Sequence, residues 1–270
     1  MEHYVNPGKN RDITVDGTVY MRHAIKTGFL QPGDNCIDFI REYASGIYRA
    51  GDILSISEKI IALSQNRVIY KKDVKLGFWA KFLSKFVMKT TAGYSVGNPL
   101  KMQVAIMLCG LPKVIYASIM GFLGKLIGKR GVFYKIVGPD VSGLDGFYGE
   151  AYECYAEMGI LNPKDPDKVC ETIYKELSVT AMIVDANDLG VEILGKYSGI
   201  THDDATLKKM VRDNPAGQSA QQTPLILIRK KSGAPDGGGD AQDAQSGTDT
   251  ENDTSTGEAP TDTSAEDNVG

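Results

Sequence analysis

The first part of the chain alternates between short apolar runs and an amphipathic segment. Residues Tyr20–Lys26 alternate apolar and polar side chains well enough to predict a strand. Apolar positions at helical spacing predict a helix over Ile37–Ala44, and the next apolar run, Ile53–Ser57, predicts a second strand that ends in the polar pair Glu58 and Lys59. A strand, a helix and a strand with a polar end are typical of an α/β-type arrangement.

The middle of the chain is predicted to be helical. Phenylalanine, tryptophan and leucine recur at helical spacing over Gly77–Lys89, with lysines on the other side, so this segment should be a strongly amphipathic helix. A second helix is expected over Asn98–Leu108 and a third in the apolar stretch after Leu111. The aromatic stripe Phe78–Val87 indicates core or an interface, and it would suit a homodimer.

The stretch Leu111–Gly138 is the most membrane-like part of the sequence, but lysines and an arginine interrupt it. Its longest uncharged piece, Val114–Gly124, has eleven residues, against the roughly 20 needed to span a bilayer. We therefore expect a soluble helix and no integral membrane segment, with attachment to an anionic membrane surface as the alternative. The glycines between Gly121 and Gly131 fit tight helix packing better than a phosphate loop, because no GxxxxGK[ST] pattern occurs.

Two apolar runs in the second half end in acidic residues. Phe133–Val137 is aromatic and β-branched, which predicts a strand, and the loop after it carries Asp140 and Asp145. A helix expected over Lys168–Leu177 leads into a buried strand that begins at Ala181. That strand ends in Asp185, Asn187 and Asp188, and a terminal strand is expected over Leu225–Arg229.

These elements predict an α+β or α/β fold, with a mixed sheet and packed helices in a single globular body over residues 1–231. Residues 232–270 contain no aromatic, leucine, isoleucine or basic residue, so they are predicted to form a disordered acidic tail. Ten of the 34 acidic residues lie there, which leaves 24 acidic against 30 basic residues in the body. A cationic body fits a polyanionic ligand such as a nucleotide, and the tail serves either solubility or screening of that charge.

Cysteine and histidine usage excludes some classes of site. The four cysteines are far apart without CxxC spacing, and the chain has only three histidines, so neither a zinc site nor a disulfide framework is predicted. The N-terminal residues do not resemble a signal peptide, and we expect a cytoplasmic protein. No basic stripe carries a known nucleic-acid reading motif, so nucleic acid is not an expected partner.

Polar residues follow three of the predicted strands, at Glu58-Lys59, at Asp140 or Asp145, and at Asp185. If these ends converge, two or three carboxylates with a lysine are suited to a divalent cation and a triphosphate, since magnesium and manganese prefer oxygen ligands. The alternative is that Asp185 and Asp188 cap a following turn or helix. The amide-rich segment 213–224 likewise fits either a substrate contact or an Asn-Pro turn.

In order along the chain, several segments resemble the coenzyme F420-0:L-glutamate ligase (F420-0:gamma-glutamyl ligase) family. The matching segments are Lys26–Asp34, Gly51–Ile61, Asn66–Val68, Gly138–Asp145, Leu161–Asp167 and Ile183–Asn187. The resemblance implies a GTP-dependent amide ligase that requires Mg²⁺ or Mn²⁺. Its small-molecule substrates would be the nucleotide, L-glutamate and a carboxylate acceptor, which is activated as an acyl phosphate.

The resemblance also implies roles for individual residues. Metal ligands would be Asp185 with Asp145 or Asp140. Ala186 stands where the family has threonine, so one oxygen ligand is lost, and Asn187 or Asp188 could replace it. The nucleotide would contact Thr27, Gly28, Phe29, Leu30, Glu58 and Lys59, and Lys59 and Asp185 would act in catalysis.

One further departure affects the nucleotide, because Leu63 stands where many family members carry a nucleotide-binding lysine. These departures leave two alternatives open. The protein could be a relative that has lost catalysis and acts as a binding or interaction module, or a ligase for an acceptor other than F420-0.

Overall fold

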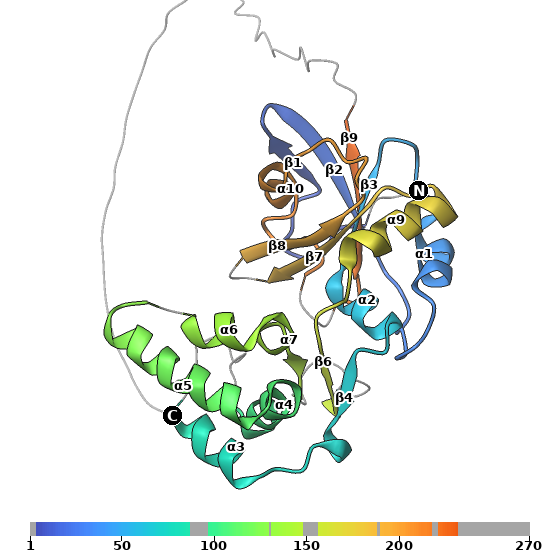
Figure 1. The fold of residues 1–270 in the computed structure, drawn as a ribbon. Coiled ribbons are helices and arrows are strands. Elements are labelled where there is room, and N and C mark those ends of the chain that lie inside the picture. The colour runs from blue at the N-terminus through green and yellow to red at the C-terminus, as the bar shows by residue number, and fades with distance from the viewer. Residues whose placement is uncertain are drawn as a thin grey trace, which may run out of the picture. The chain divides into compact units, whose positions relative to one another are not determined.

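The largest sheet has six strands in the order β1-β2-β9-β3-β7-β8, and all its neighbouring strands pair antiparallel except β3 and β7, which are parallel. A computed structural model of the protein describes residues 4–86, 97–129, 131–147, 156–187, 190–217 and 221–231. The strands are β1 (Asp12–Val15), β2 (Thr18–Ile25), β3 (Ile53–Ser57), β7 (Ala181–Asn187), β8 (Gly190–Lys196) and β9 (Leu225–Lys230). The mixed sheet is confirmed (Figure 1).

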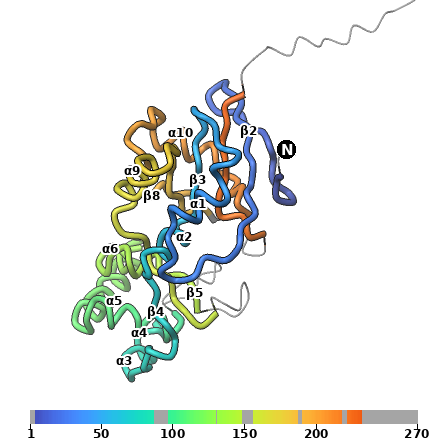
Figure 2. Tube along the Cα trace, turned by 90° about the vertical axis from the view of Figure 1, so that its right-hand side faces the viewer, coloured from blue at the N-terminus to red at the C-terminus, as the bar shows by residue number. Residues whose placement is uncertain are grey.

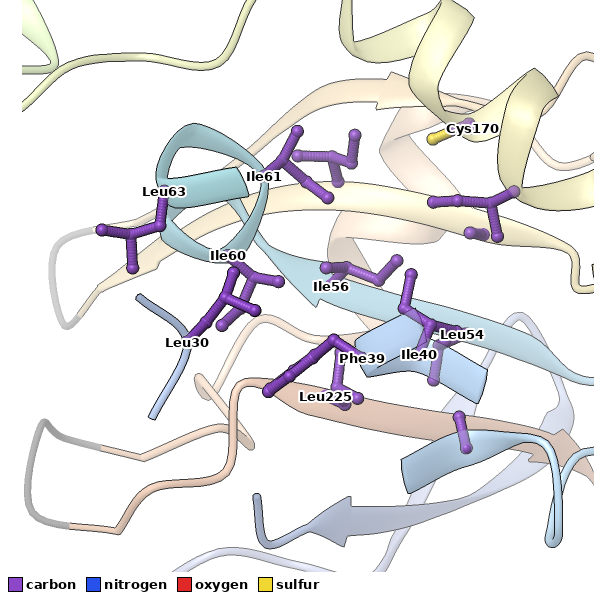
Figure 3. Close-up of a cluster of buried hydrophobic side chains, with 14 of the residues drawn as sticks. Leu30, Phe39, Ile40, Leu54, Ile56, Ile60, Ile61, Leu63, Cys170 and Leu225 are labelled. Carbon is purple, nitrogen blue, oxygen red and sulfur yellow. The ribbon is translucent and has the colours of Figure 1, made fainter. Parts of the chain in front are cut away.

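Period-two patterning places alternate strand residues on opposite faces of this sheet. In β9, Leu225 and Leu227 belong to one buried cluster while Ile226 and Ile228 belong to another. The first cluster is completed by α1 (Cys36–Ala44), α2 (Glu58–Ser64) and α9 (Pro166–Leu177), and Figure 3 shows its side chains. The second is closed by α10 (Asp204–Met210). Both faces are therefore covered, which explains why the central strands are apolar throughout.

A smaller antiparallel sheet has the order β4-β6-β5, with β4 (Val68–Tyr70), β5 (Asp145–Gly146) and β6 (Met158–Ile160). Between β4 and β5 the chain forms a group of helices that lie together in both ribbon views (Figures 1 and 2). They are α3 (Phe78–Leu83), α4 (Pro99–Cys109), α5 (Leu111–Leu126), α6 (Val132–Val137) and α7 (Pro139–Ser142), with short 3₁₀ turns over Lys71–Asp73 and Ser84–Phe86. We call residues 74–139, which contain α3 to α6 and end before Asp140 of α7, the helical segment.

The predicted strand over Phe133–Val137 is wrong, because these residues form helix α6. Phe133 and Val137 are four residues apart and both are buried against α4 and α5, which is helical and not strand periodicity. Glycines in α5 allow this approach: a Cβ atom on Gly124 would lie 2.7 Å from Cγ2 of Val132. Tertiary packing has therefore overridden the strand propensity of this segment, and the expected tight packing of the glycines is confirmed.

The other helices of this segment agree with the prediction, with one difference in length. The amphipathic helix expected over Gly77–Lys89 is α3, which ends at Leu83 and continues as a 3₁₀ turn to Phe86; residues 87–89 lie outside the described residues. No single helix in the described part of the chain is long and apolar enough to cross a membrane. The pair α4 and α5, bent by 120°, passes that test only when the two helices are taken together.

Every described element lies within one compact unit, Met1–Gly233. The predicted disorder of residues 232–270 concerns a segment outside the described residues.

Candidate functional site

Four strand ends meet at one edge of the large sheet. Strands β2, β3 and β7 finish there and β9 begins there, because Ile25 pairs with Leu225 and Leu225 with Ile56. In the parallel pair, Ser57 is the register partner of Val184. The next residues along the two strands are Glu58 and Asp185, so the convergence assumed from the sequence follows from the pairing of β3 with β7.

Glu58 is the first residue of α2 and its side chain is buried, with an exposed fraction of 7%. Its Oε2 atom has no hydrogen-bond partner within the described residues. Burial and the neighbouring Asp185 carboxylate raise the pKa of Glu58 to about 8, from the ordinary 4.5. A buried oxygen without a partner, beside a second carboxylate, favours a proton donor or a cation as its missing neighbour.

Lys59 lies next to Glu58 and makes an ion pair of 2.7 Å between its Nζ and Oδ2 of Asp145. Burial disfavours the charged form of Lys59, but the carboxylates of Asp145, Glu58 and Asp185 outweigh it and raise the lysine pKa above its ordinary value. The same pair keeps the pKa of Asp145 below its ordinary value despite burial, helped by the backbone N–H of Gly146, which donates to Asp145. Lys59 and Asp145 are therefore both charged at neutral pH.

Lys101, in helix α4, is a second cation near Asp145 that was not predicted from the sequence. Its side chain is 1% exposed and its Nζ donates a hydrogen bond of 3.1 Å to the carbonyl oxygen of Leu144, the residue before Asp145. Burial lowers the pKa of Lys101 to about 8, against the opposing effect of Asp145. The signal in the sequence was a single charged residue within the otherwise uncharged α4.

The predicted nucleotide-binding segment follows β2 at the same sheet edge. The N–H of Thr27 donates to the carbonyl of Gln222. The N–H of Gly28 donates to the hydroxyl of Tyr43 at 3.0 Å. Phe29 is 43% exposed, whereas the Leu30 side chain is buried in the core, so only its backbone is placed to meet a ligand. Gln221 has a buried Oε1 without a partner within the described residues.

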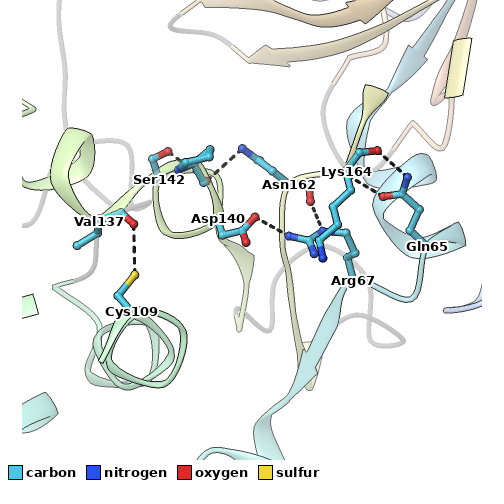
Figure 4. A network of polar contacts seen from close by, with 9 residues as sticks. Gln65, Arg67, Cys109, Val137, Asp140, Ser142, Asn162 and Lys164 are labelled. Atoms are coloured by element: carbon cyan, nitrogen blue, oxygen red, sulfur yellow. Dashed lines mark hydrogen bonds and ion pairs between the residues drawn. The ribbon is translucent and has the colours of Figure 1, made fainter. Parts of the chain in front are cut away.

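Asp140 does not join this cluster. It lies in the first turn of α7 and pairs with Arg67, which also donates to the carbonyl of Asn162, and Figure 4 shows this network. The strand that was expected to carry Asp140 is helix α6. Asp145 therefore lies beside Lys59, whereas Asp140 is paired with Arg67.

The remaining predicted positions are partly described. The side chain of Asn187, and all of Asp188, lie outside the described residues. Ala186 is half-buried at the end of β7. Leu63 is 1% exposed and packs into the core from α2, so this position is a structural one here. In the amide-rich segment the side chain of Asn214 donates to the carbonyl of Gly217 and closes a turn. This agrees with the Asn-Pro turn that was one of the two alternatives for this segment.

No three His, Cys, Asp or Glu side chains within the described ranges are grouped closely enough to hold a metal ion by themselves. Asp145 and Asp185 nevertheless supply the oxygen atoms that Mg²⁺ and Mn²⁺ prefer, and Glu58 adds the unpartnered oxygen. Magnesium is commonly held by one or two carboxylates together with substrate phosphates and water. The donor set fits an ion that arrives with a nucleotide.

Comparison with protein families gives a match over most of this arrangement. The family model described as F420-0:Gamma-glutamyl ligase matches residues 24–188, more than half of the chain. The protein belongs to the F420-0:gamma-glutamyl ligase family. The matched range runs from the end of β2 to the end of β7 and includes Lys59, Lys101, Asp145 and Asp185. No curated protein sequence matches the chain.

Membership in the F420-0:gamma-glutamyl ligase family makes the protein a ligase that forms an amide bond and supports a role in joining glutamate. Small-molecule substrates fit such a ligase. The resemblance seen in the sequence is confirmed, and the strands β8 and β9 and the helix α10 lie beyond the matched range.

Proposed function

We propose that this F420-0:gamma-glutamyl ligase couples GTP hydrolysis to the addition of L-glutamate to a carboxylate of a coenzyme F420-0-like acceptor, with Mg²⁺ or Mn²⁺ as cofactor. The observation that carries the proposal is the meeting of Glu58, Lys59, Asp145 and Asp185 at one sheet edge, with an ion pair of 2.7 Å between Lys59 and Asp145. Carboxylates beside cations are the groups that metal-assisted phosphoryl transfer requires.

The proposed reaction has two steps. A carboxylate oxygen of the acceptor attacks the γ-phosphorus of GTP, which breaks the bond to the β-phosphate oxygen and gives an acyl phosphate and GDP. The amine of L-glutamate then attacks the acyl carbon, the C–O bond to phosphate breaks, and the nitrogen loses a proton to leave the amide. Phosphate and GDP are released, so one GTP is consumed for each amide bond.

Asp145 and Asp185 are the proposed metal ligands, and Asn187 is a further candidate. The bound ion would neutralise phosphate charge and hold the triphosphate in place. Asp145 is favoured over Asp140 because Asp145 shares the ion pair with Lys59, whereas Asp140 pairs with Arg67. Asp185 is favoured because its charge acts directly on Glu58 and Lys59.

Lys59 and Lys101 are the proposed phosphate-binding cations. Lys59 is half-buried and charged, so it is suited to contact the γ-phosphate during transfer. Lys101 is held beside the Asp145 loop by the carbonyl of Leu144 and supplies positive charge that the family lysine would otherwise provide at position 63. Residues Thr27–Leu30 and Glu58 would complete the nucleotide contacts.

Two finer points belong to the same proposal. The acceptor is either an F420-0-like compound or another carboxylate compound, the two alternatives that the sequence leaves open. Formation of a glutamyl product from F420-0 would support the first acceptor. No product from F420-0, together with GTP turnover on another carboxylate acceptor, would support the second. We place the enzyme in the cytoplasm, because its proposed substrates are small, charged molecules.

The proposal is tested by calorimetric titration of GTP, and then ATP, into the full chain with and without Mg²⁺. We expect GTP binding that requires the metal and that weakens about 10- to 100-fold in Asp185→Asn and in Asp145→Asn. Asp140→Asn is the matched control: it removes the same charge from the Arg67 pair, and it should retain metal-dependent binding. Equal losses in all three variants, or no binding of either nucleotide, would contradict the assignment.

A further inference from the structure

The helical segment, residues 74–139, carries charge of only one sign. It contains ten basic residues and no aspartate or glutamate: Lys75, Lys81, Lys85, Lys89, Lys101, Lys113, Lys125, Lys129, Arg130 and Lys135. Apart from the buried Lys101, the lysines of this group that the structure describes are all exposed. The rest of the body mixes both signs, so this basic bias belongs to the helical segment and not to the protein as a whole.

The same segment exposes large apolar side chains. On α5 they recur at three- and four-residue spacing and form one face: Tyr116, Ile119, Phe122, Leu123, Leu126 and Ile127. Phe122 is 62% exposed and Leu126 is 68% exposed. The opposite face of α5 is also apolar and is buried against its neighbours through Val114 and Ala117. A helix that is apolar on both faces needs a cover on its outer face.

Helix α3 and the turn after it add an exposed aromatic cluster. Phe78 stacks on Phe82 with ring centroids 5.9 Å apart, and Phe82 meets Phe86 at 5.0 Å. Trp79 lies at the edge of the Phe78 and Phe82 rings and is 43% exposed. Aromatic side chains with adjacent lysines are typical of surfaces that insert into the boundary between lipid headgroups and acyl chains.

We propose that the exposed faces of α3 and α5 bind the surface of an anionic membrane. The apolar side chains would enter the interfacial layer, and the surrounding lysines would contact the lipid headgroups through their flexible stems. The helices would lie on the bilayer without crossing it. This inference goes beyond the ligase reaction and does not depend on it.

Two other occupants fit the surface less well. A symmetric contact between two copies of the chain would bring together two helical segments that each carry ten basic residues, Lys101 among them buried, and no acid. The acidic segment 232–270 could pair with the lysines, but it has no aromatic, leucine or isoleucine side chain to cover the apolar faces. Only a partner that is both anionic and apolar satisfies both features, and a bilayer of acidic lipids is such a partner.

The chain contains a single tryptophan, Trp79, and it lies on the proposed surface. Tryptophan emission therefore reports contact with lipid at this site alone. The full-length protein is mixed with vesicles of phosphatidylcholine, or of phosphatidylcholine with roughly one third phosphatidylglycerol. We expect flotation with the anionic vesicles only, a blue shift of Trp79 emission on binding, and loss of both at high salt.

Two double variants test the two components of the surface. Lys125→Glu with Lys129→Glu should weaken partitioning about fivefold or more for each lysine reversed. Phe122→Ser with Leu126→Ser should weaken it at unchanged charge. The matched control, Lys175→Glu with Lys208→Glu, makes the same charge change at exposed positions of α9 and α10 and should leave binding unchanged.

Several results would overturn the proposal. One is the absence of binding to anionic vesicles, and another is binding without a shift of Trp79 emission. Equal weakening by the surface and control lysine variants would show attraction by net charge only. A stable dimer by light scattering that Phe122→Ser with Leu126→Ser dissociates would assign the face to a second copy of the chain. Binding of duplex DNA, lost in the same lysine variants and not accompanied by vesicle binding, would assign it to nucleic acid.

Discussion

The sheet region and the helical segment differ in how their charged and apolar side chains are paired and exposed. Around the large sheet, buried charges are paired within the chain: Arg229 binds Asp52 with 2.6 Å between Nη2 and Oδ2, and the buried Arg22 binds Asp213. The helical segment has no acid of its own and exposes the aromatic rings of α3 and one face of α5. The first region pairs these buried charges within the chain, whereas the second exposes basic and large apolar side chains to solvent.

The candidate site contains residues from both regions. Acids come from the ends of the sheet strands and from β5, while Lys101 comes from α4 of the helical segment. The comparison therefore predicts that substitutions at paired charges of the sheet region are costly, and that substitutions on the exposed helical faces are not.

Asp52→Ala should lower the free energy of unfolding by about 3–5 kcal/mol, because it leaves the Arg229 guanidinium without its buried partner. Asp52 is 3% exposed and also accepts a hydrogen bond from the N–H of Arg49. Urea unfolding measures the change. The control is Asp38→Ala, which removes an exposed pair with Arg41 and should cost at most about 1 kcal/mol. Equal costs would show that the buried pair is no different from a surface pair.

Lys59→Met should lower kcat/KM about 10²- to 10³-fold, since it removes a cation proposed to stabilise the transferring phosphate. Steady-state kinetics measure the loss, and thermal unfolding checks that the variant is folded. Lys125→Met removes the same charge from α5 and should leave kcat/KM unchanged in the absence of membranes. A comparable loss of kcat/KM in both variants would show that the net charge of the protein, and not the position of Lys59, causes the loss.

Glu58→Gln should stabilise the protein increasingly as pH rises. The wild-type pKa is raised to about 8 by burial and by Asp185, so the folded state keeps a proton that the unfolded state releases near pH 4.5. The stabilisation from this proton is complete below pH 4.5 and is lost as pH rises towards 8. The glutamine variant has no such loss, and its advantage should reach about 2–4 kcal/mol near pH 9.

Unfolding free energies measured at acidic, neutral and alkaline pH test the Glu58 prediction. Glu176→Gln, at an exposed position of α9, should show no comparable trend. A Glu58→Gln advantage that is already present at acidic pH would point to packing and not to titration.

Phe122→Ser should change the unfolding free energy by no more than about 0.5 kcal/mol, because the side chain is largely in water in the isolated protein. Chemical unfolding measures it. Phe133→Ser is the matched control on α6: that ring is 9% exposed and packs in the helical core, so its loss should cost about 3 kcal/mol or more. A large cost for Phe122→Ser would show that its ring is already covered in solution.

The sequence predicted β2, β3, β7 and β9 because each is a short run of apolar or alternating residues, whereas β1, β8 and the three strands of the small sheet were not predicted. Leu225–Ile228 alternates between two buried clusters, and Ile53–Ser57 ends at the polar pair that begins α2. The convergence of Glu58 and Asp185 required only that β3 and β7 run parallel. Because β3 and β7 are not successive strands, the sequence does not show that they pair, and their convergence was an assumption that the observed pairing now supports.

The structure of the helical segment was harder to predict from the sequence, because tertiary packing determines it. Val132–Val137 has strand propensity, yet it lies on α5 as a helix where Gly121 and Gly124 leave room for it. Lys101 was missed for a related reason. Its distance in sequence from Asp145 gives no sign that α4 passes the Asp145 loop, and only the hydrogen bond to Leu144 shows it.

The position of β9 has a consequence for how the protein is made. Its residues, Leu225–Lys230, pair with β2 on one side and with β3 on the other, so a strand from near the end of the described chain occupies the middle of the sheet. During synthesis β2 leaves the ribosome about 200 residues before β9, and β3 about 170 residues before it, so the edges that pair with β9 stay unpaired until then. The nascent chain should therefore require chaperone protection, and any ribosome stalled before Leu225 would release a product that cannot close its sheet.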